Sequence, residues 1–215
     1  MPFTAEQFFD VFARYNNAVW PAQAFLNLLA VLVVILCFKK GSPSALVPSA
    51  LGVLWIWTGG VYHLMFFSAI NPIARVAGWL FIAQGILFLY TGLVTKELRF
   101  RFTRSIRGIT GAVMILYALI FYPMLGFFLG HVYPYAPTFG APCPTTIFTL
   151  GMLLWGETRP RWFVVLVPVL WAFFGSSAVV MFAVKEDAGL FLAAWLLLGL
   201  RGMKQLWPAA QPAGA

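Results

Sequence analysis

The chain has 215 residues, of which 62% are hydrophobic and only 9% are charged. Soluble domains contain about 25% charged residues and cannot bury so much apolar surface, so this composition excludes a soluble protein and predicts an integral membrane protein in a lipid bilayer. The formal net charge of +8 does not indicate a nucleic-acid partner, because the basic residues lie in short clusters between apolar stretches.

Residues 1–17 are predicted to form a separate amphipathic helix. Thr4 and Gln7 have the spacing of a capping box, and aromatic residues recur at helical intervals on the side opposite Asp10 and Arg14. We expect this helix to lie flat at the outer surface of the membrane. There it anchors the chain or covers a pocket that opens to the outside.

Seven apolar stretches follow within residues 18–204 and predict an all-α membrane protein with seven transmembrane helices. A helix that crosses ~30 Å of hydrocarbon needs about 20 residues. The predicted spans are residues 19–38, 45–68, 76–95, 106–130, 145–156, 162–184 and 188–200. The fifth and seventh are short, and if one of them is re-entrant the count falls to six. Residues 205–215 are a Pro/Ala-rich tail that we expect in the cytoplasm.

The basic residues predict that the N-terminus lies outside and the C-terminus inside. Cytoplasmic loops are enriched in lysine and arginine, and this orientation leaves only Arg14, Arg75 and Lys185 outside. The other eleven of the fourteen basic residues then lie inside: Lys39, Lys40, Lys96, Arg99, Arg101, Arg104, Arg107, Arg159, Arg161, Arg201 and Lys204. An even number of spans breaks this segregation, so the charge pattern also favours seven.

Two parts of the chain resemble each other and suggest an internal repeat. Prolines in the first part have counterparts in the same order in the second: Pro21, Pro43 and Pro48 correspond to Pro144, Pro160 and Pro168. Spans one to three then repeat as spans five to seven, in a parallel 3+1+3 arrangement of a kind known from transporters. The alternative is a chance alignment of apolar sequence. The layout is similar to those of the SWEET sugar transporters and the rhodopsins, but their signature residues are absent, so this likeness concerns architecture alone.

Polar residues inside a membrane are costly and therefore mark candidate functional positions. No charged residue lies deep in a predicted span, which argues against a pump built on buried carboxylates. The other polar and titratable side chains lie mainly toward the outer ends of the spans. We expect them to converge on an outward-facing pocket lined by His63, Gln84, His131, Tyr133, Cys143, Thr145, Thr146 and Ser176.

Three functions remain open on these observations. In the first, a transporter or channel binds or passes a small, largely uncharged solute through this pocket. In the second, His63, His131 and Cys143 hold a copper, zinc or mercury ion, or the two histidines hold a haem iron. In the third, the protein is a sensor or partner subunit that signals through the basic loop 96–107. No Ser/His/Asp set, paired membrane carboxylates or His-rich cluster indicates an enzyme.

Gly126 and Gly130 have the small-xxx-small spacing of close helix packing. They are predicted to mark the face of a homo-oligomer or a close contact within the bundle.

Three motifs carry a resemblance to a known family. They are residues 2–9 (PFTAEQFF), residues 20–23 (WPAQ) and residues 143–146 (CPTT). The chain resembles an uncharacterised family of bacterial membrane proteins, catalogued as a domain of unknown function, over nearly its whole length up to Pro208. The resemblance implies a multi-pass protein of the bacterial inner membrane. It brings no activity, cofactor or site residue.

Overall fold

A computed structural model describes residues 3–39 and 45–207 of the chain, and these residues form an all-α protein. Four parts of the sequence predictions lie outside the described residues: residues 1–2 of the N-terminal helix, Lys40 of the basic set, residues 41–43 of the repeat, and the tail from Pro208. The elements in chain order are α1 (Ala5–Val19), α2 (Ala22–Phe38), α3 (Leu46–Trp57), η1 (Thr58–Phe66), η2 (Phe67–Ala69), α4 (Ala74–Leu89), η3 (Tyr90–Val94), α5 (Ile106–Leu116), η4 (Tyr117–Phe121), α6 (Tyr122–Phe128), α7 (Pro142–Leu154), α8 (Trp162–Gly175), α9 (Ala178–Met181), η5 (Lys185–Asp187), α10 (Ala188–Gly202) and η6 (Lys204–Leu206).

All seven ranges predicted to span the membrane contain helix. Four helical segments are long and apolar enough to cross a membrane: Leu46–Ala69, Ala74–Val94, Ile106–Phe128 and Trp162–Met181. A fifth is added if α1 and α2, which are bent by 87°, are counted as one span. The helices α7 and α10 have only 13 and 15 residues. The structure is therefore that of an all-α protein with several helices able to cross a bilayer.

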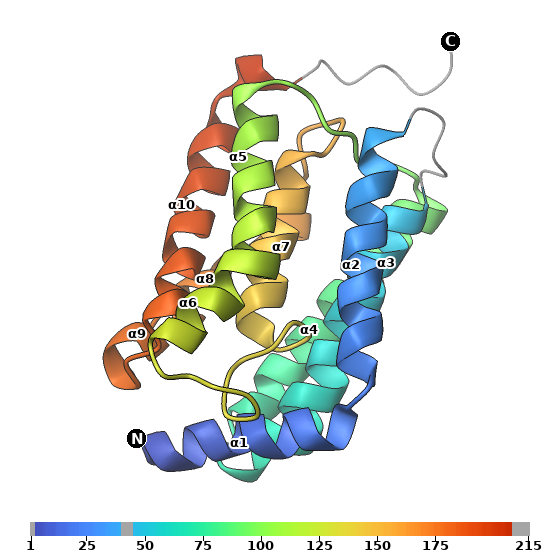
Figure 1. Ribbon diagram of the computed structural model, residues 1–215. Helices are drawn as coiled ribbons and strands as arrows, with labels where there is room; N and C mark the ends of the chain where they lie inside the picture. The colour runs from blue at the N-terminus through green and yellow to red at the C-terminus, as the bar shows by residue number, and fades with distance from the viewer. Residues whose placement is uncertain (1–2, 40–44, 208–215) are drawn as a thin grey trace.

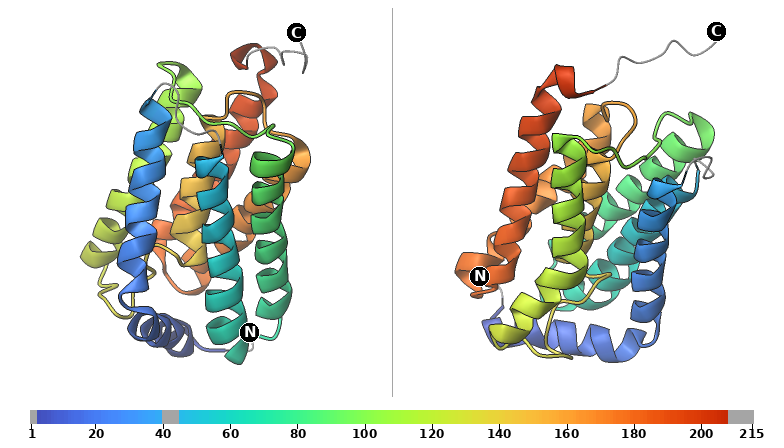
Figure 2. Two further views of the ribbon diagram at one scale, coloured as in Figure 1. Left: turned by 90° about the vertical axis from the view of Figure 1, so that its right-hand side faces the viewer. Right: turned by 45° about the horizontal axis from the view of Figure 1, so that its top comes forward.

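The N-terminal helix α1 lies across one end of the bundle (Figures 1 and 2). Thr4 and Gln7 form the predicted capping box. The first span was predicted to begin at Val19, but Val19 belongs to α1, and α2 begins after Pro21. The reason is that proline has no backbone N–H to continue the helix, so the chain turns there.

Contacts with the segment before α7 and with the end of α3 hold α1 against the bundle. The side chain of Asn16 donates to the carbonyl oxygens of Pro134 and Ala136 at 2.6 and 2.8 Å. The Trp57 indole donates to the hydroxyl of Tyr15 at 2.9 Å. The buried face of α1 therefore closes this end of the bundle, while its charged residues face outward.

Three of the helices contain π-helical turns, namely η1, η3 and η4. Such turns widen a helix locally and are frequent at functional positions. Here η1 contains His63 and η4 contains Tyr117, which both belong to the buried polar clusters described below.

The short helix α7 lies at the centre of the molecule (Figure 1), and every one of its residues is buried. It packs against α3, α5, α8 and α10. A close approach of backbones makes this possible, because a Cβ atom on Gly111 of α5 would lie 2.7 Å from the carbonyl oxygen of Gly151 of α7. A helix enclosed by protein need not match the thickness of the lipid, which accounts for its short length.

The packing does not follow the predicted 3+1+3 repeat. In that repeat α7 corresponds to α2. However, α7 contacts both of the helices that follow it, α8 and α10, whereas α2 lies at the edge and packs mainly on α3. Large side chains of α2 are exposed, including Phe25 and Leu28. The two helices thus occupy different environments.

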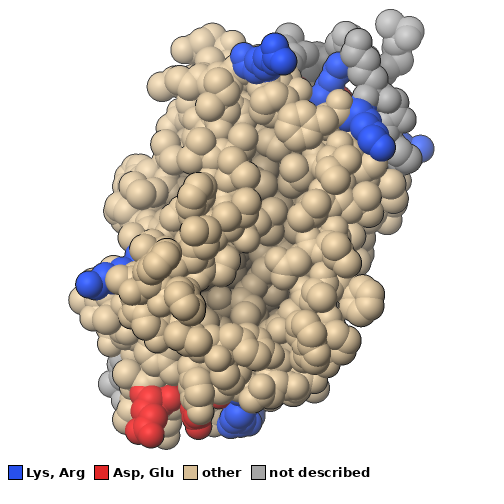
Figure 3. Space-filling model, viewed as in Figure 1, with Lys and Arg blue, Asp and Glu red and all other residues tan. Residues whose placement is uncertain are grey.

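Most basic residues of the described chain gather at the end opposite α1; Arg14, Arg75 and Lys185 do not. The basic residues at that end lie after α2, between η3 and α5, between α7 and α8, and at the end of α10, and Figure 3 shows a broad uncharged surface below them. Arg107 has a structural role there, because its Nη1 donates to the carbonyl oxygens of Leu154 and Gly156 at 2.7 and 2.6 Å. A cation at this position compensates the free carbonyls at the C-terminus of α7.

Candidate functional site

The structure places two adjacent carboxylates inside the protein at the α1 end of the bundle. Glu186 and Asp187 end η5 and directly precede α10, and both are buried. The N-terminus of a helix favours negative charge because its backbone N–H groups are unpaired. We call the group around them the acidic cluster; its members are Tyr117, Tyr122, His131, Cys143, Glu186 and Asp187.

Glu186 is paired with a histidine that comes from the loop after α6. The Nδ1 atom of His131 lies 2.7 Å from Oε1 of Glu186, and the His131 side chain is 14% exposed whereas that of Glu186 is fully enclosed. Phe9 of α1 packs on the imidazole with ring centroids 5.0 Å apart. The second oxygen of Glu186, Oε2, is buried and has no hydrogen-bond partner among residues 3–39 and 45–207. His131 therefore lies between a buried carboxylate and the surface.

Asp187 accepts hydrogen bonds from two other helices. The hydroxyl of Tyr122 on α6 donates to Asp187 Oδ1 at 2.6 Å, and the thiol of Cys143 on α7 donates to the same carboxylate. Burial raises the pKa of Asp187 to about 7, although these two hydrogen bonds lower it and Glu186 raises it further. A carboxyl group with this pKa exchanges its proton near neutral pH.

A small residue makes room for the acidic cluster. A Cβ atom on Gly126 would lie 3.1 Å from Glu186 Oε1 and 3.8 Å from the His131 side chain. Gly126 thus faces the interior of this chain, which gives an intramolecular reason for its size. Gly130, the other glycine of the predicted packing motif, ends the helix with a positive φ of 91°.

A second buried polar group surrounds His63, and we call it the His63 cluster. His63 is fully enclosed, and neither of its ring nitrogens has a hydrogen-bond partner in the described protein. Its ring lies 4.8 Å from that of Phe81 and 4.9 Å from that of Trp171, between centroids. Tyr62 and Phe67 complete the cluster. The indole N–H of Trp171 is also buried, and no described residue accepts a hydrogen bond from it.

The remaining predicted residues on the helices lie at separate positions. Gln84 donates to the carbonyl oxygen of Val164 at 3.0 Å, and its own Oε1 has no partner within the described ranges. Thr145 accepts from the backbone N–H of Gly140 at 3.2 Å. Thr146 is buried with an unpartnered hydroxyl. Of the predicted set, only His131 and Cys143 come together, through the acidic cluster.

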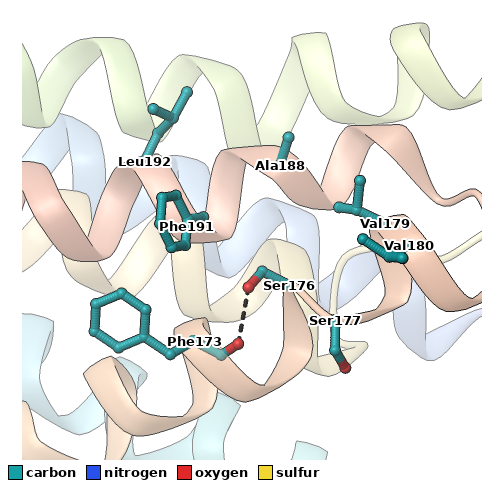
Figure 4. A pocket seen from close by; sticks show the side chains of 8 residues that line it. All are labelled: Phe173, Ser176, Ser177, Val179, Val180, Ala188, Phe191 and Leu192. Atoms are coloured by element: carbon teal, nitrogen blue, oxygen red, sulfur yellow. Dashed lines mark hydrogen bonds between the residues drawn. The ribbon is translucent and has the colours of Figure 1, made fainter.

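Tyr133 and Ser176 lie near the surface. The hydroxyl of Tyr133 donates to the backbone oxygen of Asn16 at 3.2 Å, which helps to hold α1. Ser176 lines an open groove between α8, α9 and α10, where its hydroxyl donates to the Phe173 carbonyl at 2.8 Å (Figure 4). The other residues lining this groove are Phe173, Ser177, Val179, Val180, Ala188, Phe191 and Leu192. The Ser176 hydroxyl therefore already has a hydrogen-bond partner at the end of its own helix.

The predicted metal ligands do not form a common centre. Within residues 3–39 and 45–207, no group of three or more His, Cys, Asp or Glu side chains is placed to hold a metal ion. His63 is enclosed by aromatic rings, while His131 and Cys143 contact different carboxylates. The three residues were expected to be neighbours because all lie toward the outer ends of their spans, but a shared depth does not bring side chains together.

Sequence reasoning missed the two residues around which the polar groups assemble. Glu186 and Asp187 fell between the predicted spans 162–184 and 188–200 and were not singled out, and a pump built on buried carboxylates was argued against. The chain has only six acidic residues, and these two are adjacent just before the last helix. That placement was the signal for them, because a helix start favours carboxylates. Tyr117 and Tyr122, which contact them, gave no signal beyond their aromatic character.

Comparison with known proteins identifies a family and nothing further. The family of unknown function DUF6064 matches residues 5–206 of the chain. Neither a curated protein nor a solved structure matches it significantly.

Proposed function

Because the chain belongs to DUF6064, a family of unknown function, we propose a function from its own residues: it is a multi-pass membrane protein that binds a small, largely uncharged solute at the His63 cluster and passes it across the bilayer. The observation that carries this proposal is the enclosed His63 imidazole, whose two nitrogens have no hydrogen-bond partner in the part of the chain that the structure describes. In the proposed topology seven helices span a bacterial inner membrane, with the N-terminus outside.

The distribution of charge and apolar surface supports the membrane topology. Most basic residues lie at the end opposite α1, as the positive-inside tendency requires for an outside N-terminus. Large apolar side chains are exposed along the helices between the two ends, including Trp79, Val113 and Leu170. Such a surface is stable only when lipid covers it.

The topology can be tested by reporter fusion. Alkaline phosphatase is active only outside the cytoplasm, whereas green fluorescent protein is fluorescent mainly inside it. With the N-terminus outside, fusions after residue 100 are fluorescent and those after residue 135 have phosphatase activity. Phosphatase activity after residue 100 would contradict the orientation.

The surroundings of His63 support solute binding. Ligand sites are mostly apolar, with aromatic walls and a few polar groups that fix the orientation of the ligand. The His63 cluster has this composition, with an imidazole and the Trp171 indole N–H among Phe67, Phe81 and Tyr62. Buried polar atoms in native proteins normally have a hydrogen-bond partner. A neutral solute that both donates and accepts hydrogen bonds would supply one.

The passage of solute is tested with proteoliposomes and named probes. Glycerol, urea and erythritol are neutral and carry both donors and acceptors. We expect at least one of them to enter vesicles containing the purified protein faster than it enters empty vesicles, as followed by light scattering after an osmotic jump. His63→Leu is expected to abolish the difference, because it removes both ring nitrogens.

The matched control is Trp79→Phe, which alters an exposed aromatic residue on α4 and should leave the rate unchanged. Binding is followed separately through the tryptophan fluorescence of the detergent-purified protein, since Trp171 lies beside His63. Rates equal to those of empty vesicles for every probe, together with unchanged fluorescence, would overturn the proposal.

A further inference from the structure

The acidic cluster has a feature that the solute-binding proposal does not use. Two adjacent carboxylates are enclosed in protein, yet among the described residues neither forms an ion pair with a lysine or arginine. Ionised carboxylates that are buried without a cation are strongly disfavoured, and such groups bind protons instead. Glu186 Oε2 is moreover enclosed, and no described residue forms a hydrogen bond with it.

The groups that face the pair come from every element packed around it. Tyr117 of η4 donates to the backbone oxygen of Glu186 at 2.7 Å. Tyr122 and Cys143 donate to Asp187, and Tyr62 of η1 lies near enough to interact electrostatically with it. These four side chains are neutral at physiological pH and do not compensate a charge. Lys185, on the same element, is exposed.

His131 gives the pair a path to the outside. It contacts Glu186 at 2.7 Å while 14% of its side chain is exposed. An imidazole can accept a proton on one nitrogen and release one from the other, which makes histidine suitable for proton transfer. Phe9 of α1 covers one face of the ring, so the path opens beside the N-terminal helix.

We propose that Glu186 and Asp187 form a proton-binding site that holds one proton between them at neutral pH, with His131 as the relay that exchanges this proton with the outside. The ligand is the proton itself, and the site lies at the α1 end of the bundle. Chains of Asp, Glu and His residues carry protons in membrane pumps and transporters. The site therefore gives this protein a means to respond to, or to use, a proton gradient.

The site is tested by infrared spectroscopy of the detergent-purified protein, which needs no solute and so remains informative if the solute proposal fails. A protonated carboxyl group gives a C=O stretching band that an ionised carboxylate lacks. We expect this band to be present at about pH 6 and to disappear by about pH 9. Exposed carboxyl groups do not contribute to it, because they are already ionised throughout this range. Replacement of the pair by Glu186→Gln with Asp187→Asn should abolish the band.

Glu6→Gln on the exposed face of α1 is the matched control and should leave the band unchanged. Loss of the band in Asp187→Asn alone or in Glu186→Gln alone would place the proton on that residue and support the site. Absence of the band from the wild type, or its persistence in the double variant, would overturn the proposal. Near-ultraviolet circular dichroism of each variant verifies that the fold is retained.

The relay is tested by the rate at which the band shifts in D₂O. His131→Gln should slow this shift, whereas Tyr133→Phe, on the same loop, should not. An equal rate in His131→Gln and the wild type would overturn the assignment of His131 as the relay.

Discussion

The acidic cluster and the His63 cluster both bury polar groups, but they differ in whether those groups form hydrogen bonds with other parts of the protein. Side chains from α6, α7 and the loop after α6 converge on Glu186 and Asp187 with short hydrogen bonds. His63 has no such partner and is surrounded by aromatic rings. A buried group that is bonded by several elements ties them together, while one without a protein partner remains available to a ligand.

The difference matters for what each cluster contributes to stability. Removal of one partner from a buried pair leaves the other group uncompensated, which destabilises the fold. Removal of a group that has no partner takes away an unfavourable burial instead. Substitutions in the two clusters should therefore have opposite or very unequal effects on the free energy of unfolding.

The largest effect is expected from His131→Ala, which removes the one side chain among the described residues that pairs with the buried Glu186 carboxylate. We expect the free energy of unfolding to fall by about 3 kcal/mol, measured by SDS-induced unfolding in mixed micelles. Arg161→Ala is the control, since it breaks an exposed ion pair with Glu97 and should cost less than about 1 kcal/mol. Equal losses in the two variants would contradict the role of the buried pair.

The pH dependence of stability should come next in size. In the folded protein burial raises the pKa of Asp187 from the ordinary value of 3.8 to about 7. Between these two values the folded state holds a proton that the unfolded state has released. Stability is therefore highest below about pH 4 as far as this group is concerned, falls as pH rises toward 7, and levels off above it.

The free energy of unfolding changes by at most about 1.4 kcal/mol per pH unit for one titrating group. The contribution of Asp187 is isolated by subtracting the free energy of unfolding of Asp187→Asn at each pH from that of the wild type, because the other titrating groups contribute equally to both. Unfolding measured at several pH values between about 5 and 8 should give a difference that shrinks to a constant above neutral pH. A difference that does not vary with pH would show that Asp187 is ionised in the folded protein throughout.

Tyr122→Phe removes the hydroxyl that donates to Asp187 at 2.6 Å, and we expect it to lower the free energy of unfolding by about 2 kcal/mol. Tyr133→Phe provides the comparison, because that hydroxyl makes a longer contact of 3.2 Å from a largely exposed side chain. Its loss should be less than half as large. The reverse order would mean that the loop contact, rather than the acidic cluster, holds this end of the bundle.

The smallest effect is expected for His63→Leu, in the other cluster. No hydrogen bond to protein is lost, so the free energy of unfolding should change by less than about 1 kcal/mol. The same variant is expected to abolish solute passage, which separates a binding role from a structural one. A loss of stability similar to that of His131→Ala would show that His63 has a structural partner.

The positions of the helices were predictable from local sequence. Apolar stretches, the Thr4 and Gln7 capping box, and Pro21 at the bend are properties of neighbouring residues, and the structure places helices accordingly. The gathering of basic residues at one end also followed from their places between the apolar stretches. In these cases the interactions that decide the structure join residues within one or two helical turns, or the outcome depends only on the order of the elements along the chain.

The candidate site was predictable only in part. His131 and Cys143 were identified as polar residues near the outer ends of helices, and they do contact one buried cluster. Their partners Glu186 and Asp187 were not identified, because they lie in the short connection between the predicted spans 162–184 and 188–200. His63 and Ser176 were expected to share a pocket, but one is enclosed and the other lines a surface groove.

By itself, the sequence determined a chain of apolar helices with most of its basic residues at one end, because composition and spacing decide which segments can be helical and which require lipid or protein cover. The tertiary structure decided that α7, and not α2, occupies the centre, and that Glu186 and Asp187 are enclosed. Both outcomes depend on which helix faces meet. That choice is made by contacts between residues far apart in the chain, such as Gly111 with Gly151 and Tyr122 with Asp187.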